Sequence, residues 1–292
     1  MKLMLFIVLL SFASLAFAQP AEPPKPRDDS AAEKLGWKLA TQAWTFRDRT
    51  AFAAIQTAEE LGLKYIELFP GQDLGKDYPG AKVGPEMNQE QRKELKKHLA
   101  KSNVKLMNFG VVNFTNDEAA ARKIFDFAKE MGIETITCEP ALDAWPLVEK
   151  LADEYKVNAA CHDHPKPSTY WNPDTVLANI KGRSKRLGAC ADTGHWPRSG
   201  LNAVECLKKL EGRIISLHFK DIAPADSTGK DQPWGTGANN AKGILEELHR
   251  QGFKGVISVE YETGAGPELE KNVAKCIAFF DATARELAAS KK

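Results

Sequence analysis

The sequence lacks features that are typical of nucleic-acid-binding, membrane-binding, disulfide-rich and dinucleotide-binding proteins. Its 40 basic and 39 acidic residues leave a formal net charge of +1, so it has no electrostatic footprint for nucleic acid or for an anionic membrane. The five cysteines are an odd number and lie in apolar or helical patterns, so we expect buried thiols without a disulfide framework. No G-x-G-x-x-G motif follows the first predicted strand, which argues against a dinucleotide-binding sheet.

The first residues have the features of an export signal. Lys2 precedes the apolar run from Leu3 to Leu10, and Ala16-Phe17-Ala18 forms a cleavage signal before Gln19. A membrane anchor is the weaker alternative, because the run is well short of the ~20 residues that span a bilayer. We predict a signal peptide at residues 1–18, cleaved after Ala18, and a periplasmic or secreted protein with no membrane association after cleavage.

The remaining chain has the size of one barrel domain. Four prolines at positions 20, 23, 24 and 26 favour an extended linker over residues 19–30. Residues 31–292 are close in number to one α/β barrel. We therefore predict one catalytic domain after a proline-rich linker.

A pattern of amphipathic helix, glycine and apolar strand repeats along this domain. Its glycines, expected to end helices in the left-handed conformation, are Gly62, Gly132, Gly212 and Gly252, and its strands close on Glu67, Glu139, His218 and Glu260. The other strand-like runs are Lys38–Phe46, Val104–Phe109, Val157–His162 and Arg186–Asp192. Strands alternating with helices predict parallel β-α-β units. Eight of them predict a single (β/α)8 TIM barrel, with an open doubly wound sheet as the alternative.

Polar residues gather where the predicted strands end, which is where barrels place catalytic groups. They are Trp44, Glu67, Glu139, His162, His164, Asp192, His195, His218, Lys220, Asp221, Glu260 and Glu262. Carboxylates are rarely buried unless they are paired or hold a metal. Carboxylates and imidazoles without a thiolate suit one divalent ion, and Mn²⁺, Co²⁺, Mg²⁺ and Zn²⁺ all stay open.

The individual motifs leave alternatives open. Asp192 and His195 can enter one site across a glycine turn, or Asp192 can cap the next helix. His218 and Lys220 share a strand face, which either enters the site or is a solvated strand end. Of His162 and His164, we favour His164 as the residue that faces the site.

Three further side chains have two readings each. Glu67 either contacts substrate or pairs with a neighbouring strand. Trp44 and Trp234 either stack on a sugar face or pack the rim of the barrel, with rim packing slightly favoured. The long segments 70–87 and 222–240 are expected to cover the mouth of the barrel.

In this order the motifs resemble those of the xylose-isomerase-like TIM-barrel superfamily. The similarity is to the sugar phosphate isomerase/epimerase group, which includes ketose 3-epimerases and inosose dehydratases, and it covers about residues 36–285. The motifs are IEL at 66–68, CEP at 138–140, HDHP at 162–165, ADTGHW at 191–196, LHFKD at 217–221, GTG at 235–237 and SVEYE at 258–262.

The resemblance implies a role for each strand-end residue. One metal would be held by Glu139, Asp192, His218 and Glu260, with Glu139 and Glu260 also transferring protons. His195 would contact a substrate oxygen, and His164 would line the same pocket. The other candidate substrate contacts are Trp44, Glu67, Lys220 and Trp234.

The implied activity is that of a metal-dependent sugar isomerase or epimerase working through an enediolate. The export signal and the absence of a phosphate-binding glycine motif favour an unphosphorylated sugar or keto-sugar. A keto-glycoside lyase or hydratase, or an inosose-type dehydratase, is the alternative, and a non-catalytic sugar-binding barrel is a second one. The expected partner is a small-molecule sugar, and assembly into a homo-oligomer stays open.

Overall fold

The computed structural model describes residues 27–290. The predicted signal peptide and most of the predicted linker lie outside these residues. Arg27 forms an ion pair with Asp281, at 2.7 Å from Nη2 to Oδ1, and its side chain is 7% exposed. Packed structure therefore already includes Arg27, which places the linker boundary earlier than the predicted residue 30, because this guanidinium is anchored to the last helix.

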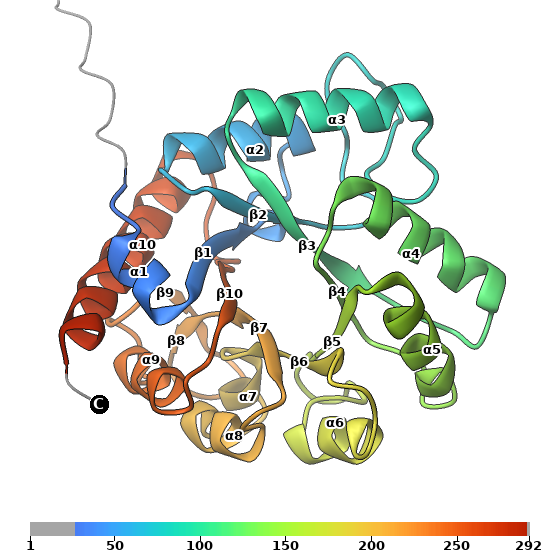
Figure 1. Cartoon of the computed structure of the whole chain (residues 1–292). Helices are drawn as coiled ribbons and strands as arrows, with labels where there is room; N and C mark the ends of the chain where they lie inside the picture. The colour runs from blue at the N-terminus through green and yellow to red at the C-terminus, as the bar shows by residue number, and fades with distance from the viewer. Residues whose placement is uncertain (1–26, 291–292) are drawn as a thin grey trace, which may run out of the picture.

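Eight parallel strands form a closed barrel in the order β1-β10-β7-β6-β5-β4-β3-β2 (Figure 1). Their bounds are β1 Trp37–Gln42, β2 Tyr65–Leu68, β3 Lys105–Val112, β4 Thr135–Cys138, β5 Asn158–His162, β6 Leu187–Asp192, β7 Ile214–Phe219 and β10 Gly255–Val259. This closure confirms the predicted (β/α)8 barrel and removes the open-sheet alternative.

Helices cover the outside of the barrel, and the short α1 lies beside the long α10 (Figure 1). Their bounds are α1 Ser30–Leu35, α2 Ala51–Glu60, α3 Gln89–Lys101, α4 Glu118–Met131, α5 Trp145–Tyr155, α6 Pro173–Ile180, α7 His195–Arg198, α8 Ala203–Lys209, α9 Ala241–Arg250 and α10 Gly266–Ala289. Within the described residues, no helix is both long enough and apolar enough to cross a membrane.

Local sequence signals set the ends of these helices. Asn88 and Gln91 form a capping box at the start of α3, which satisfies backbone N–H groups that have no partner within the helix. Gly132 ends α4 with φ +72°, a conformation that costs other residues energy. The other three predicted glycines also have positive φ values, between 66° and 74°. These values confirm the predicted left-handed conformation at the helix ends of the repeat.

Two segments differ from the predicted elements. The first strand ends at Gln42 instead of continuing to Phe46, and a 3-10 helix, η1 (Ala43–Phe46), follows because the Gln42 side chain accepts a hydrogen bond from the Trp44 N–H at 3.1 Å. The segment 222–240 contains a strand, β9 (Lys230–Gln232), which pairs antiparallel with β8 (Asp221–Ala223). Asp221 stabilises this segment by accepting the N–H groups of Gly235 and Gly237 at 2.9 and 3.0 Å.

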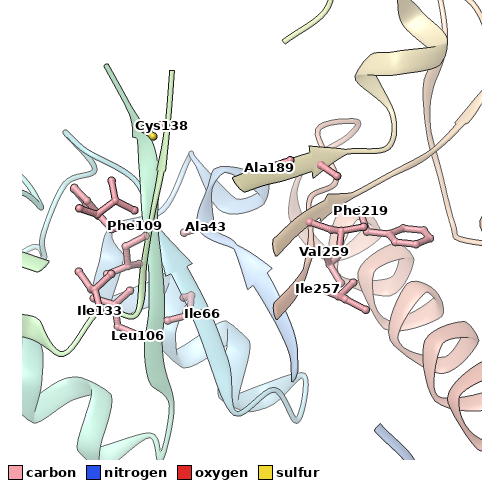
Figure 2. Packing of buried hydrophobic residues seen from close by; sticks show 14 of the residues in the cluster. Ala43, Ile66, Leu106, Phe109, Ile133, Cys138, Ala189, Phe219, Ile257 and Val259 are labelled. Atoms are coloured by element: carbon pink, nitrogen blue, oxygen red, sulfur yellow. The ribbon is translucent and has the colours of Figure 1, made fainter. Parts of the chain in front are cut away.

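The main hydrophobic core lies between the strands and the helices, and the barrel interior near the site is polar. Phe219, Ile257 and Val259 belong to this core and are grouped on one side of their strands, beside a helix (Figure 2). Because side chains alternate along a strand, His218 and Ser258 face the interior instead. All five cysteines are buried and free, as the sequence predicts.

Candidate active site

A cavity of about 340 Å³ opens at the carboxyl ends of the strands, which is within the usual size of small-molecule sites. Its lining residues are Gln42, Trp44, Phe69, Pro70, Gly110, Val111, His162, His164, His195, Glu260 and Glu262. The structure therefore brings to one place six residues that the strand-end argument selects, namely Trp44, His162, His164, His195, Glu260 and Glu262.

Four buried residues form a cluster at this end of the barrel. One ligand atom from each of His162, Asp192, His218 and Glu260 lies within 4.8 Å of the others. Asp192 and His218 are register neighbours on adjacent strands, and His162 ends β5. Three of the four predicted metal ligands thus converge, and the fourth position belongs to His162.

The remaining predicted ligand, Glu139, lies in a second group. Its carboxylate lies close to the rings of His162 and His164. The Oε1 atom is 3.2 Å from His162 Nδ1 and is also in contact with His164 Nδ1. β4 ends at Cys138, so Glu139 lies one residue past the strand, and it is not among the residues lining the cavity. The structure therefore differs from the ligand set that the resemblance implies, since Glu139 lies behind His162.

His162 and His164 both reach the site, although the sequence suggested that only one of them would face it. His162 is buried and belongs to both groups, whereas the side chain of His164 is 47% exposed and lines the cavity. The residues share a face, as expected, and differ in depth because His162 closes the strand while His164 lies in the loop after it.

Asp192 fulfils both of its predicted roles, one with each oxygen. Oδ1 accepts the backbone N–H groups of Gly194 and His195, both at 2.9 Å, at the start of α7. Oδ2 lies 3.5 Å from His162 Nε2 and 2.5 Å from Lys220 Nζ. The helix-start contact thus fixes the carboxylate so that its second oxygen faces the cluster.

Lys220 lies against three carboxylates and near the ring of His195, at 3.5 Å from Nζ to Nε2, and it is not among the cavity-lining residues. Its Nζ lies 2.5 Å from Asp192, 2.6 Å from Glu260 and 2.7 Å from Glu262, and its side chain is 0% exposed. The structure therefore places Lys220 as a counter-charge to the cluster and not as the predicted substrate contact.

Glu67 lies in the barrel interior below the cavity and is fully buried. It accepts the hydroxyl of Thr137 at 2.7 Å and that of Ser258 at 3.2 Å, and its Oε1 is 3.1 Å from His218 Nε2. Of its two predicted roles, the structure favours pairing with neighbouring strands, because these bonds surround it. A carboxylate behind His218 leaves Nδ1 of that ring for the cluster.

The two predicted tryptophans have different environments. Trp44 is 41% exposed at the rim of the cavity and packs edge-on against Phe69, with ring centroids 5.1 Å apart. Trp234 is 2% exposed and packs against Phe219, on the helix side of β7. Of its two predicted roles, the structure favours packing for Trp234, which is not among the residues that line the cavity.

The charges within the cluster shift one another's pKa values. Burial disfavours the ionised carboxylates, but His195, Lys220 and His162 hold the pKa of Asp192 well below its usual value, and Lys220 and His218 lower the pKa of Glu260. Burial would also lower the pKa of His162, but the carboxylates of Asp192 and Glu139 on either side of its ring raise it to about 10. The cluster is therefore a set of mutually stabilised opposite charges.

The geometry and chemistry of the cluster fit a divalent metal ion. His162 Nε2 and His218 Nδ1 are buried without a hydrogen-bond partner, and unpaired buried polar atoms are costly. Together with Asp192 and Glu260 they make a set of two imidazoles and two carboxylates, which borderline divalent ions accept. Binding would displace protons from the two rings.

Two residues of the site were given no role from the sequence. Glu262, one of the predicted strand-end residues, lines the cavity and pairs with Lys220; its place two residues after Glu260 puts it on the same face, because alternate residues share a face. Arg198 contacts His195 through Nη1 at 3.2 Å, and its only sequence signal was the three-residue spacing on a helix.

Comparison with known proteins places this barrel in a family. The model of the family described as xylose isomerase-like TIM barrel matches residues 55–283. No curated protein matches the chain by sequence.

Solved structures share the architecture. A protein from Parabacteroides distasonis ATCC 8503 is 31% identical, with a TM-score of 0.70 over 85% of this chain and 99% of its own. A D-tagatose 3-epimerase-like protein is 17% identical, with a TM-score of 0.67 over 86% and 98%. A xylose isomerase-like TIM barrel protein from Mycobacterium smegmatis in complex with magnesium is 15% identical, with a TM-score of 0.66 over 88% and 99%. The two more distant structures establish the fold alone. Since the family model matches most of the chain, this protein belongs to the xylose isomerase-like TIM-barrel family.

Proposed function

We propose that this protein is a divalent-metal-dependent isomerase or epimerase of an unphosphorylated sugar or keto-sugar, acting through an enediolate. The observation that carries the proposal is the buried cluster of His162, Asp192, His218 and Glu260 beside a cavity of about 340 Å³. The fold that the chain shares with a D-tagatose 3-epimerase-like protein adds support.

The four cluster residues would hold the ion. When bound, a divalent ion supplies a Lewis acid that stabilises negative charge on sugar oxygens. Mn²⁺, Co²⁺, Mg²⁺ and Zn²⁺ all stay candidates, and the magnesium complex of the Mycobacterium smegmatis protein supports a metal at this fold.

Glu260 is the residue we assign to removal of the carbon-bound proton. It lines the cavity, and the ammonium of Lys220, 2.6 Å from its Oε2, keeps it ionised and therefore able to accept a proton. For the second transfer we assign Glu139 acting through His164, because His164 lines the cavity while its Nδ1 contacts Glu139. His195 would donate a hydrogen bond to a substrate oxygen.

The cavity wall favours an uncharged sugar. Among the described residues that line it there is no lysine or arginine, the side chains that most often hold phosphate. Trp44 and Phe69 form an aromatic wall that can pack on the apolar face of a sugar ring. We further propose that the chain is exported and cleaved after Ala18, which N-terminal sequencing of the protein from its native host would test.

Proton exchange with solvent tests the proposal directly. Metal-loaded protein in D2O, given a panel of free aldoses, ketoses and 3-keto-glycosides, is expected to label a carbon next to a carbonyl. Glu260→Gln is expected to lose the exchange by about 10²- to 10⁴-fold, since an amide is not a base. Glu246→Gln, an exposed glutamate on α9, is the matched control and should exchange like the parent.

Product analysis then assigns the reaction. Inverted configuration means epimerisation and a moved carbonyl means isomerisation. Loss of water or of an aglycone would replace the proposal by a lyase, hydratase or dehydratase activity. Sugar binding by calorimetry without exchange or product would replace it by a non-catalytic sugar-binding barrel.

A further inference from the structure

The residues that line the cavity divide into a polar side and an apolar side. The histidines and glutamates come from the ends of β5, β6 and β10. The opposite side, the apolar wall, comes from the ends of β1, β2 and β3, which are neighbours in the barrel. Its members are Trp44, Phe69, Pro70, Gly110 and Val111. Gln42, at the end of β1, lines the cavity on this apolar side and is 1% exposed.

The amide of Gln42 connects two parts of the apolar wall. Its Oε1 accepts the N–H of Trp44 at 3.1 Å, and its Nε2 donates to the carbonyl oxygen of Gly110 at 3.1 Å. A backbone N–H can only donate and a carbonyl oxygen can only accept, so one orientation of the amide makes both bonds. Gln42 therefore links the segment after β1 to the end of β3, across β2.

The register between β3 and β4 shifts where Gln42 binds. Two residues of β3, Gly110 and Val111, lie opposite one residue of β4, Thr137. Such a bulge interrupts the ladder and turns side chains in a new direction, and Val111 lines the cavity. A Cβ at Gly110 would lie 2.2 Å from the carbonyl oxygen of Thr137, so glycine allows this close approach. The bulge is thus held by β4 on one side and by Gln42 on the other.

Gln42 is an unusual residue for the start of a helix. It occupies the N-cap position of η1, where Ser, Thr, Asp and Asn are preferred. An asparagine could also accept the N–H of Trp44, but its side chain is one methylene shorter. The longer glutamine side chain reaches Gly110 as well, so the link across β2 explains this residue better than the cap alone does.

Other contacts fix the turn that carries Trp44. The hydroxyl of Thr45 accepts the N–H of Tyr261 at 3.0 Å and donates to the carbonyl of Val259 at 3.3 Å, which ties η1 to the end of β10. The ring of Trp44 packs edge-on against Phe69. Trp44 is 41% exposed, so its position depends on these contacts more than on burial.

We propose that Gln42 is a positioning residue that holds Trp44 and Val111 at the spacing in which the apolar wall receives the apolar face of a sugar ring. Both polar atoms of the amide bind the backbone of the wall, so Gln42 acts through Trp44 and Val111. A wall that is fixed before binding loses less conformational freedom on binding, which increases affinity. The sugar contact rests on the proposed function, whereas the link between the two parts of the wall does not.

The experiment reads the two parts of the wall separately. The protein is labelled with 5-fluorotryptophan and with ¹³C in its valine methyl groups, and NMR spectra are recorded without metal or sugar. Trp44→Phe and Val111→Ala assign the two signals. Gln42→Met can make neither bond and should move or broaden both signals. Gln42→Asn should move the Val111 signal and leave that of Trp44 near its parent position, because asparagine keeps the cap.

Gln251→Met is the matched control. It removes a glutamine that also donates to a backbone carbonyl, that of Leu207 at 2.9 Å, and it should leave both signals unchanged. In the metal-loaded protein, calorimetry should show that Gln42→Met binds a sugar on which the parent exchanges protons about 3- to 10-fold more weakly, the range that one or two hydrogen bonds allow. Its metal stoichiometry should equal that of the parent.

Three results would overturn the proposal. They are parent-like Trp44 and Val111 signals in Gln42→Met, a Val111 signal in Gln42→Asn that does not move, and an unchanged sugar affinity in Gln42→Met. The asparagine variant decides where Gln42→Met does not fold. The spectra need no ligand or turnover, so failure there is distinct from failure of the proposed function, in which the parent itself would exchange no sugar.

Discussion

Replacing Lys220 with methionine should destabilise the metal-free protein strongly. The ammonium is the shared partner of Asp192, Glu260 and Glu262 at 2.5 to 2.7 Å, and the Asp192 and Glu260 side chains are 0% and 8% exposed. Removing one partner of a buried ion pair typically costs about 3–5 kcal/mol, because the remaining charge is left uncompensated. At about 2–4 °C per kcal/mol for a domain of this size, the melting temperature should fall by about 6–20 °C.

The assay is thermal unfolding followed by circular dichroism, in EDTA and with saturating Mn²⁺. Addition of Mn²⁺ should raise the melting temperature of Lys220→Met more than that of the parent, since a cation in the cluster would replace the missing charge. Lys208→Met is the matched control: its ion pair with Glu205 is half-exposed, and such pairs contribute about 0.2–1 kcal/mol. If Lys220→Met in EDTA melts within the range of this control, the ammonium does not balance the buried carboxylates and the reasoning is refuted.

Two further substitutions test the supports of the site and of the fold. Glu67→Gln should weaken metal binding by about 10- to 100-fold, the usual effect of losing the carboxylate behind a ligand histidine; calorimetric titration measures it, and an unchanged dissociation constant would mean that Glu67 does not orient His218. Gly132→Ala should lower the free energy of unfolding by about 1–2 kcal/mol, because φ is +72° at this position; urea unfolding measures it, and a stability equal to the parent's would contradict the left-handed helix end.

The barrel could be predicted because its signals are local and repeat. A glycine such as Gly132 marks a helix end wherever it occurs, and the apolar strand after it follows from composition. The early end of β1 was missed because it depends on one side-chain hydrogen bond, from the Trp44 N–H to Gln42, which the apolar pattern does not reveal.

The sequence predicted most residues of the site, but it did not predict how their side chains contact one another. Strand ends converge in any barrel, which is sufficient to group Asp192, His218 and Glu260. The contacts within the site could not be predicted in the same way: Glu139 lies level with His162, because Cys138 and Cys161 are register neighbours, but its carboxylate contacts the rings of His162 and His164 and is not part of the cluster. The position of Arg198 behind His195 depends on a short helix and a hairpin that the sequence pattern did not indicate.

Metal stoichiometry at saturation tests the central claim most directly. After equilibrium dialysis against excess Mn²⁺, elemental analysis of the parent should give about one ion per chain. His162→Ala, Asp192→Ala and His218→Ala should each lose most of it, whereas Glu139→Ala should still reach about one ion with weaker affinity. Full occupancy in both Asp192→Ala and His218→Ala, or loss in Glu139→Ala with full occupancy in His162→Ala, would contradict the proposal that the buried cluster holds a metal ion.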